Sequence, residues 1–75
     1  MLANDHKTVL GALIGAARRP LILEEVAASA GLPFERTWYA VLELIELQYM
    51  TPAGAGLYCL TDEGEKSARQ LTASR

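Results

Sequence analysis

The segment FERTWYAVLELIELQ, residues 34–48, decides the fold because its apolar and polar side chains separate at helical spacing. On a helix of about 100° per residue, one broad face collects Thr37, Trp38, Val41, Leu42, Leu44, Ile45 and Tyr49. The opposite face collects Glu35, Arg36, Tyr39, Glu43 and Glu46. We therefore predict a helix over residues 34–48 that turns its apolar face, Trp38 included, into the core.

Upstream of this helix, the sequence predicts two further helices separated by a short strand. Residues 5–19 carry apolar side chains at helical spacing, with Asn4 or Asp5 as a cap and a proline after the end. The apolar run 21–23 follows as the strand. The next helix, residues 24–31, opens with two glutamates and ends at a glycine that suits the left-handed C-terminal position.

Downstream of it, the sequence predicts a hairpin and a last helix. The extended segments are residues 49–52 and 57–60, and the sequence AGAG at 53–56 between them is typical of a turn. Thr61 or Asp62 then caps the last helix. The order is helix, short strand, helix, tight turn, helix, hairpin, helix. This order predicts a mainly α protein with a small β-hairpin, of the α+β class, with a winged helix-turn-helix topology.

Two stretches of the chain resemble known families with this topology. Residues 37–42 (TWYAVL), continuing to Ile45, Glu46 and Met50, resemble the TLYxxLxxLExxGLI stretch of PadR-like and MarR-like repressors. Residues 57–64 (LYCLTDEG) resemble the YxLTxxG junction between the wing and the last helix in the same families. The resemblance covers nearly the whole chain.

Seventy-five residues suffice for one domain, so we expect a single winged helix-turn-helix domain over residues 1–75. Its helix-turn-helix is expected at about 24–48, its wing at about 49–60 and its C-terminal helix at about 62–71. The resemblance implies a transcriptional regulator that binds double-stranded DNA as a homodimer through helix 5–19 and the C-terminal helix. The residues available for that dimer contact are Met1, Leu2, Gly11 and Gly15.

In these families the helix that corresponds to residues 34–48 enters the DNA major groove. Carried onto this sequence, the resemblance gives a set of candidate DNA contacts. They are Arg36, Tyr39 and Glu43, with Glu35 and Phe34 at the helix start, and the cations Arg18 and Arg19 are added to them as candidates from their charge. Lys66 and Arg69 are further cations on which binding would depend.

Charge argues for a second hypothesis from a different class. The net charge is −2, the predicted wing is uncharged, and the polar face of helix 34–48 sets three glutamates against one arginine. Phosphates and acceptor base edges would meet like charge there. The alternative is a protein-protein interaction module, or an antagonist that mimics DNA, using Glu35, Glu43 and Glu46. The sequence leaves both hypotheses open.

Five further positions carry expectations of their own. Cys59, in a predicted strand, is expected to be a small core residue, and His6 is expected to be solvated. Tyr49 stands where the families have a helix-ending glycine, and we expect it to be a buried aromatic. Gly11 and Gly15 indicate either close approach by another element or simple tolerance of glycine.

The sequence lacks the residue patterns that are typical of metal-binding proteins, enzymes and membrane proteins. One cysteine and one histidine cannot supply a zinc site, and no metal or other cofactor is expected. The sequence has no Ser-His-Asp set and no phosphate-binding glycine loop, so we do not expect an enzyme. No apolar run approaches the length of a membrane span and no signal peptide is evident, so the expected location is the cytoplasm.

Overall fold

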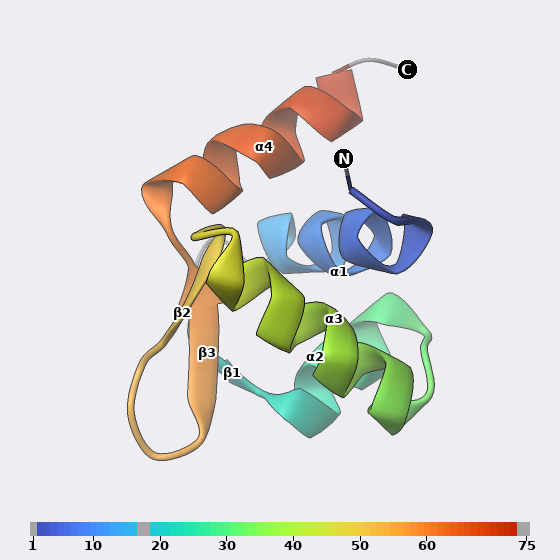
Figure 1. Ribbon diagram of the computed structural model, residues 1–75, viewed down its shortest axis with the longest axis vertical. Helices are drawn as coiled ribbons and strands as arrows, with labels where there is room; N and C mark the ends of the chain where they lie inside the picture. Colours follow the sequence, from blue (N-terminus) through green and yellow to red (C-terminus); the bar gives the residue numbers. More distant parts are fainter. Residues whose placement is uncertain (1, 17–18, 74–75) are drawn as a thin grey trace.

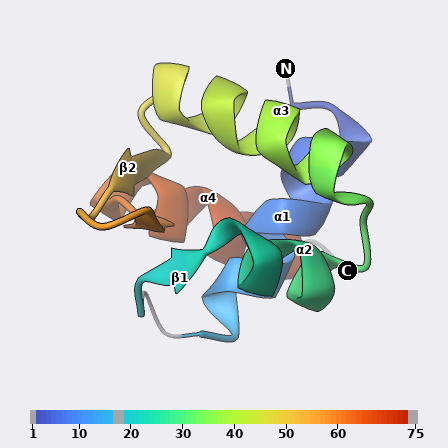
Figure 2. The same ribbon diagram turned by 90° about the horizontal axis from the view of Figure 1, so that it is seen from below.

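The computed structural model describes residues 2–16 and 19–73, which form helices and a small sheet in the predicted order (Figures 1 and 2). The elements are α1 (Asn4–Ile14), β1 (Leu21–Ile22), α2 (Leu23–Ala30), α3 (Phe34–Glu46), β2 (Met50–Pro52), β3 (Leu57–Leu60) and α4 (Asp62–Ala73). Helix α1 lies in the middle and contacts all three other helices, with α4 on one side and α2 and α3 on the other.

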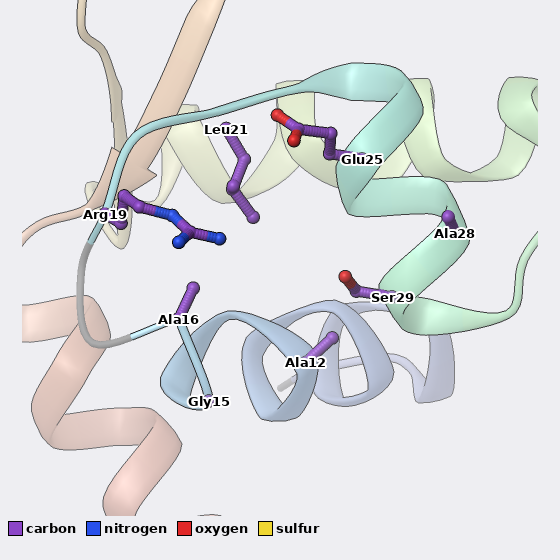
Figure 3. Close-up of a pocket in the computed structure, with 8 residues that line it drawn as sticks. All are labelled: Ala12, Gly15, Ala16, Arg19, Leu21, Glu25, Ala28 and Ser29. Atoms are coloured by element: carbon purple, nitrogen blue, oxygen red, sulfur yellow. The ribbon is translucent and has the colours of Figure 1, made fainter.

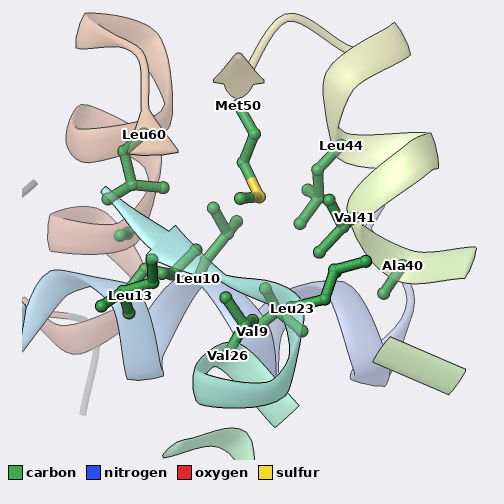
Figure 4. Close-up of a cluster of buried hydrophobic side chains, with 12 residues drawn as sticks. Val9, Leu10, Leu13, Leu23, Val26, Ala40, Val41, Leu44, Met50 and Leu60 are labelled. Carbon is green, nitrogen blue, oxygen red and sulfur yellow. The ribbon is translucent and has the colours of Figure 1, made fainter. Parts of the chain in front are cut away.

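The core consists of small aliphatic side chains, as a composition with few aromatic residues requires (Figure 4). Its twelve buried members are Val9, Leu10, Leu13, Leu21, Leu23, Val26, Ala40, Val41, Leu44, Met50, Leu60 and Ala68. They come from every helix and every strand. Burial of this apolar surface is the main favourable term in folding, and it fixes α3 against α1 and α2.

The first strand joins the hairpin to form a three-stranded antiparallel sheet in the order β1-β3-β2. Leu21 pairs with Tyr58, and Met50 pairs with Leu60. The predicted strand 21–23 was one residue too long, because Leu23 begins α2 and is buried in the core. Cys59, predicted in the core, is only half-buried in the central strand.

Helix α1 differs from its prediction at both ends. It begins at Asn4 with Ala3 as its cap, so neither Asn4 nor Asp5 caps it. It ends at Ile14 rather than at residue 19, with Gly15 as its C-cap. The Asp5 side chain does not cap the helix because it accepts hydrogen bonds from Arg36 of α3. Glycine is a poor helix former, which accounts for the early end.

The end of α3 is a Schellman motif with an unusual central residue. The N–H of Gln48 donates to the carbonyl of Ile45 and the N–H of Tyr49 donates to that of Leu44, at 3.0 and 2.9 Å. Gln48 has a φ of 67°, the left-handed conformation that normally takes glycine. The helix therefore ends at Glu46, two residues before the predicted end, and Gln48 rather than Tyr49 takes the left-handed position after it. Tyr49 is half-buried against the core, short of the full burial that was expected.

We expect Gln48→Gly to stabilise the fold. The left-handed conformation costs a residue with a Cβ about 1–2 kcal/mol, and the greater chain entropy of glycine in the unfolded state cancels part of the gain. The net increase in the free energy of unfolding should be about 0.5–1 kcal/mol, measured by urea denaturation. A decrease would show that the Gln48 side chain stabilises the fold by more than its backbone strain costs.

The wing connects to α4 through a compact junction. Thr61 is the cap that α4 uses, because its Oγ1 accepts a hydrogen bond from the N–H of Gly64 at 3.0 Å. The same hydroxyl donates to the carbonyl of Gln48 at 2.7 Å, and the N–H of Thr61 donates to the carbonyl of Tyr49 at 3.1 Å. These bonds tie the end of α3 to the start of α4.

Candidate macromolecular interface

Helix α3 has a narrower buried face than its sequence predicts. The buried residues are Thr37, Ala40, Val41 and Leu44, at spacings of three and four. Trp38 and Leu42, both predicted in the core, are 38% and 40% exposed. Seven apolar or weakly polar residues form too broad an arc for one helix contact, so those nearest the opposite face reach solvent.

The solvent-facing side of α3 is apolar and acidic. We call Glu35, Trp38, Tyr39, Leu42 and Glu46, all exposed, the outward stripe. Tyr39, at 63%, has the most exposed aromatic ring on the helix. At the start of α3, the side chains of Phe34, Glu35, Trp38 and Tyr39 surround a shallow hollow of about 330 Å³. Trp38 and Leu42 are the candidate contact residues that the sequence interpretation missed, because their apolar character placed them in the core.

Arg36 does not lie on the outward stripe but on the side of α3 that contacts α1. Its Nε donates to Asp5 Oδ2 at 3.0 Å and its Nη2 donates to Asp5 Oδ1 at 2.6 Å. This bidentate hydrogen bond from Arg36 lowers the pKa of Asp5 below its usual 3.8, and the bond to Asp5 raises the pKa of Arg36. The main cationic candidate for DNA contact is thus engaged by a carboxylate.

The lowered pKa of Asp5 predicts a pH signature. A carboxyl whose pKa falls on folding stabilises the fold above its unfolded pKa, and that contribution is lost as pH falls through the folded value. Asp5→Asn should therefore lower the free energy of unfolding at pH 7, with a difference from wild type that shrinks below pH 3.8. Urea denaturation across this range measures it. Arg36→Gln should show the same loss, and the double variant should lose little more than either single variant.

His6 and Glu43 make a second contact between α1 and α3. The ring Nδ1 of His6 accepts from the N–H of Ala3 at 3.0 Å, which leaves Nε2–H to donate to Glu43 Oε1 at 2.8 Å. His6 is only 7% exposed, so the expectation of a solvated histidine was wrong. The sequence did not reveal the contact because the two residues lie 37 positions apart. Glu43 is therefore positioned beside α1, like Arg36.

The other predicted contacts are scattered. Arg19 reaches over a hollow of about 320 Å³ between α1 and α2, which α3 does not line (Figure 3). Arg18 lies outside the described residues. Lys66 and Arg69 are on α4, where Arg69 is 3.7 Å from Glu65. The loop between β2 and β3 has only alanine and glycine. Within residues 2–16 and 19–73, no lysine or arginine belongs to the outward stripe.

Within those same ranges, no helix is long and apolar enough to cross a bilayer, and no three His, Cys, Asp or Glu residues gather as metal ligands.

Comparison with known proteins gives one informative likeness. No family model matches the chain, and no curated protein matches it. A solved structure, that of a MarR family transcriptional regulator from Silicibacter pomeroyi, superimposes with a TM-score of 0.82 over 97% of this chain, at 24% sequence identity. The chain spans about half of that regulator, 54% of its length. The described residues form four helices and a three-stranded antiparallel sheet, and these elements superimpose on that regulator over nearly their full length. This chain therefore has the winged-helix fold.

Proposed function

We propose that this chain is the DNA-binding domain of a transcriptional regulator, with α3 inserted in the major groove of double-stranded DNA. The observation that carries the proposal is that α3 presents an exposed stripe of side chains to solvent in a winged-helix fold. A surface helix of this size fits the major groove. The likeness to a solved transcriptional regulator supports the same use of the fold.

The contacts that position α3 support this proposal. Asp5 pairs with Arg36, and His6 pairs with Glu43. These two pairs hold α3 against α1 at two points that are about two helical turns apart. A recognition helix held at two points loses less freedom when it binds. Arg36 and Glu43 thus act as positioning residues, and direct DNA contact falls to the outward stripe and to Phe34 at the start of the helix.

Binding to a labelled random-sequence duplex at low salt, followed by fluorescence anisotropy, tests the proposal. We expect saturable binding of wild type and its loss in the double variant Tyr39→Glu with Leu42→Glu, which adds two negative charges to the outward stripe. Lys7→Glu on α1, an exposed lysine outside the candidate DNA contacts, changes the net charge by the same amount and is the matched control. It should weaken binding only modestly. Equal loss in both would show that net charge, not α3, governs the binding.

Homodimerisation is the second part of the proposal. We propose that the outer sides of α1 and α4, which contact each other within the chain, also form the dimer contact. A two-fold dimer would present two copies of α3 to successive major grooves. Sedimentation equilibrium over a range of protein concentrations measures the association. A single monomer mass at every concentration would contradict it while leaving DNA binding by the monomer open.

A specific observation favours a second candidate function, contact with another protein. The outward stripe combines two carboxylates with Trp38, Tyr39 and Leu42, which is a composition suited to a partly basic protein surface. Glu35→Lys with Glu46→Lys separates the two functions, since neither residue bonds to α1. If the partner is DNA, this double variant should bind the duplex more tightly than wild type. If wild type binds no duplex at low salt, protein contact is favoured instead.

A further inference from the structure

We propose that α3 recognises DNA sequence through the methyl groups of thymine, by apolar contact from the outward stripe. The inference deepens the proposed function and rests on it. It has two observations as its basis. Trp38 and Leu42 are exposed apolar side chains of the outward stripe, and among the residues that the structure describes this stripe has no lysine or arginine.

The apolar part of the stripe has the spacing for base-edge contact. Trp38 and Leu42 are four residues apart on α3, so they lie on neighbouring turns separated by about 6 Å along the helix axis. Base pairs are stacked about 3.4 Å apart along DNA. The separation along α3 exceeds one base-pair step, so the two side chains can reach the edges of different base pairs. The C5-methyl of thymine is the apolar group that the major groove displays.

The hollow at the start of α3 extends this apolar surface. It lies between the aromatic rings of Phe34, Trp38 and Tyr39, with the carboxylate of Glu35 at its side. A methyl group that projects from a base edge would enter this hollow and lose contact with water on several sides. Removal of apolar surface from water provides the favourable free energy for that contact.

The carboxylates of the outward stripe, Glu35 and Glu46, disfavour contact with guanine. Guanine presents two acceptors, O6 and N7, which arginine and lysine normally recognise. Arg36, the one arginine of α3, is bonded to Asp5 beside α1. Glu35 and Glu46 would face the guanine acceptors with carboxylate oxygens, which is repulsive, whereas they accept hydrogen bonds from the amino groups of cytosine and adenine. Thymine with neighbouring cytosine or adenine is the edge pattern that the stripe fits.

Replacement of thymine by deoxyuridine tests the inference, because it removes only the methyl group. The 75-residue chain is first used to select duplexes from a random library at low salt, and each thymine of a selected duplex is then replaced in turn. We expect enrichment of thymine, and about a fourfold loss of affinity for each contacted methyl group that is removed.

Variants of exposed leucines identify the contact. Leu42→Ala should abolish most of the penalty for deoxyuridine at one position of the site. Leu47→Ala, an exposed leucine just beyond the helix and outside the stripe, should leave the penalty intact. Deoxyuridine duplexes that bind as tightly as thymine duplexes would overturn the inference and leave DNA binding standing. Failure to bind any duplex would overturn the proposed function, and the inference with it.

Discussion

Gly64→Ala is expected to destabilise the fold by about 1–3 kcal/mol or more, the cost typical of an overfilled site. A Cβ at Gly64 would lie 1.8 Å from the carbonyl oxygen of Tyr49 and 2.8 Å from its carbonyl carbon. That carbonyl cannot move away freely, because it accepts the N–H of Thr61 at 3.1 Å. A chain of this size has roughly 4–11 kcal/mol of stability in total. Urea denaturation would show the loss directly.

Gly11→Ala is the matched control for this variant. Both glycines are helical, so alanine offers each the same gain in helix propensity of about 1 kcal/mol. Nothing lies within 4 Å of a Cβ at Gly11, so its substitution should stabilise the chain, measured at a concentration where it is monomeric. Gly11 and Gly15 are therefore not required by close approach of another element within the described chain, and α1 simply tolerates glycine at these positions. Opposite signs at Gly11 and Gly64 are the expected result, and stabilisation at both would contradict the close approach of α4 to Tyr49.

The junction around Gly64 also shows what the sequence predicts well. The LTDEG stretch, residues 60–64, combines a capping threonine with a glycine three residues later. Thr61, one of the two predicted caps, bonds the N–H of Gly64, whereas the need for glycine at position 64 comes from the backbone of Tyr49 and was not predicted. Local patterns of this kind, together with the order of apolar runs, were enough to predict the winged-helix topology.

The candidate site was predicted less well because its side chains depend on distant partners. Arg36 and Glu43 have the same exposed, polar pattern as free contact residues, and no local signal marks their bonds to Asp5 and His6. The separation of 31 residues between Arg36 and Asp5 comes only from the packing of α3 on α1. Tyr39 was placed correctly on the exposed side, since it lies opposite the buried arc of α3, and Phe34 is exposed because it is the first residue of the helix.

The leucines of α3 show the same limit and give the second large prediction. Leu42 and Leu44 lie about 200° apart on a helix, at the two edges of the predicted apolar face, and both were assigned to the core. Leu44 is fully buried among Val41, Met50 and the rest of the core (Figure 4). Leu42, in contrast, is 40% exposed. Leu44→Ala removes buried contacts and leaves a cavity, so it should cost about 2–5 kcal/mol of unfolding free energy.

Leu42→Ala should cost clearly less, about 1 kcal/mol, because 40% of Leu42 is already exposed and its loss leaves no closed cavity. Thermal denaturation separates the two, since each 1 kcal/mol shifts the melting temperature by about 4–8 °C in a domain of this size. Equal costs would mean that α3 is rotated from the orientation described, and the outward stripe would no longer face solvent. A stable Leu42→Ala variant is also the condition under which its loss of thymine discrimination reports on DNA contact rather than on folding.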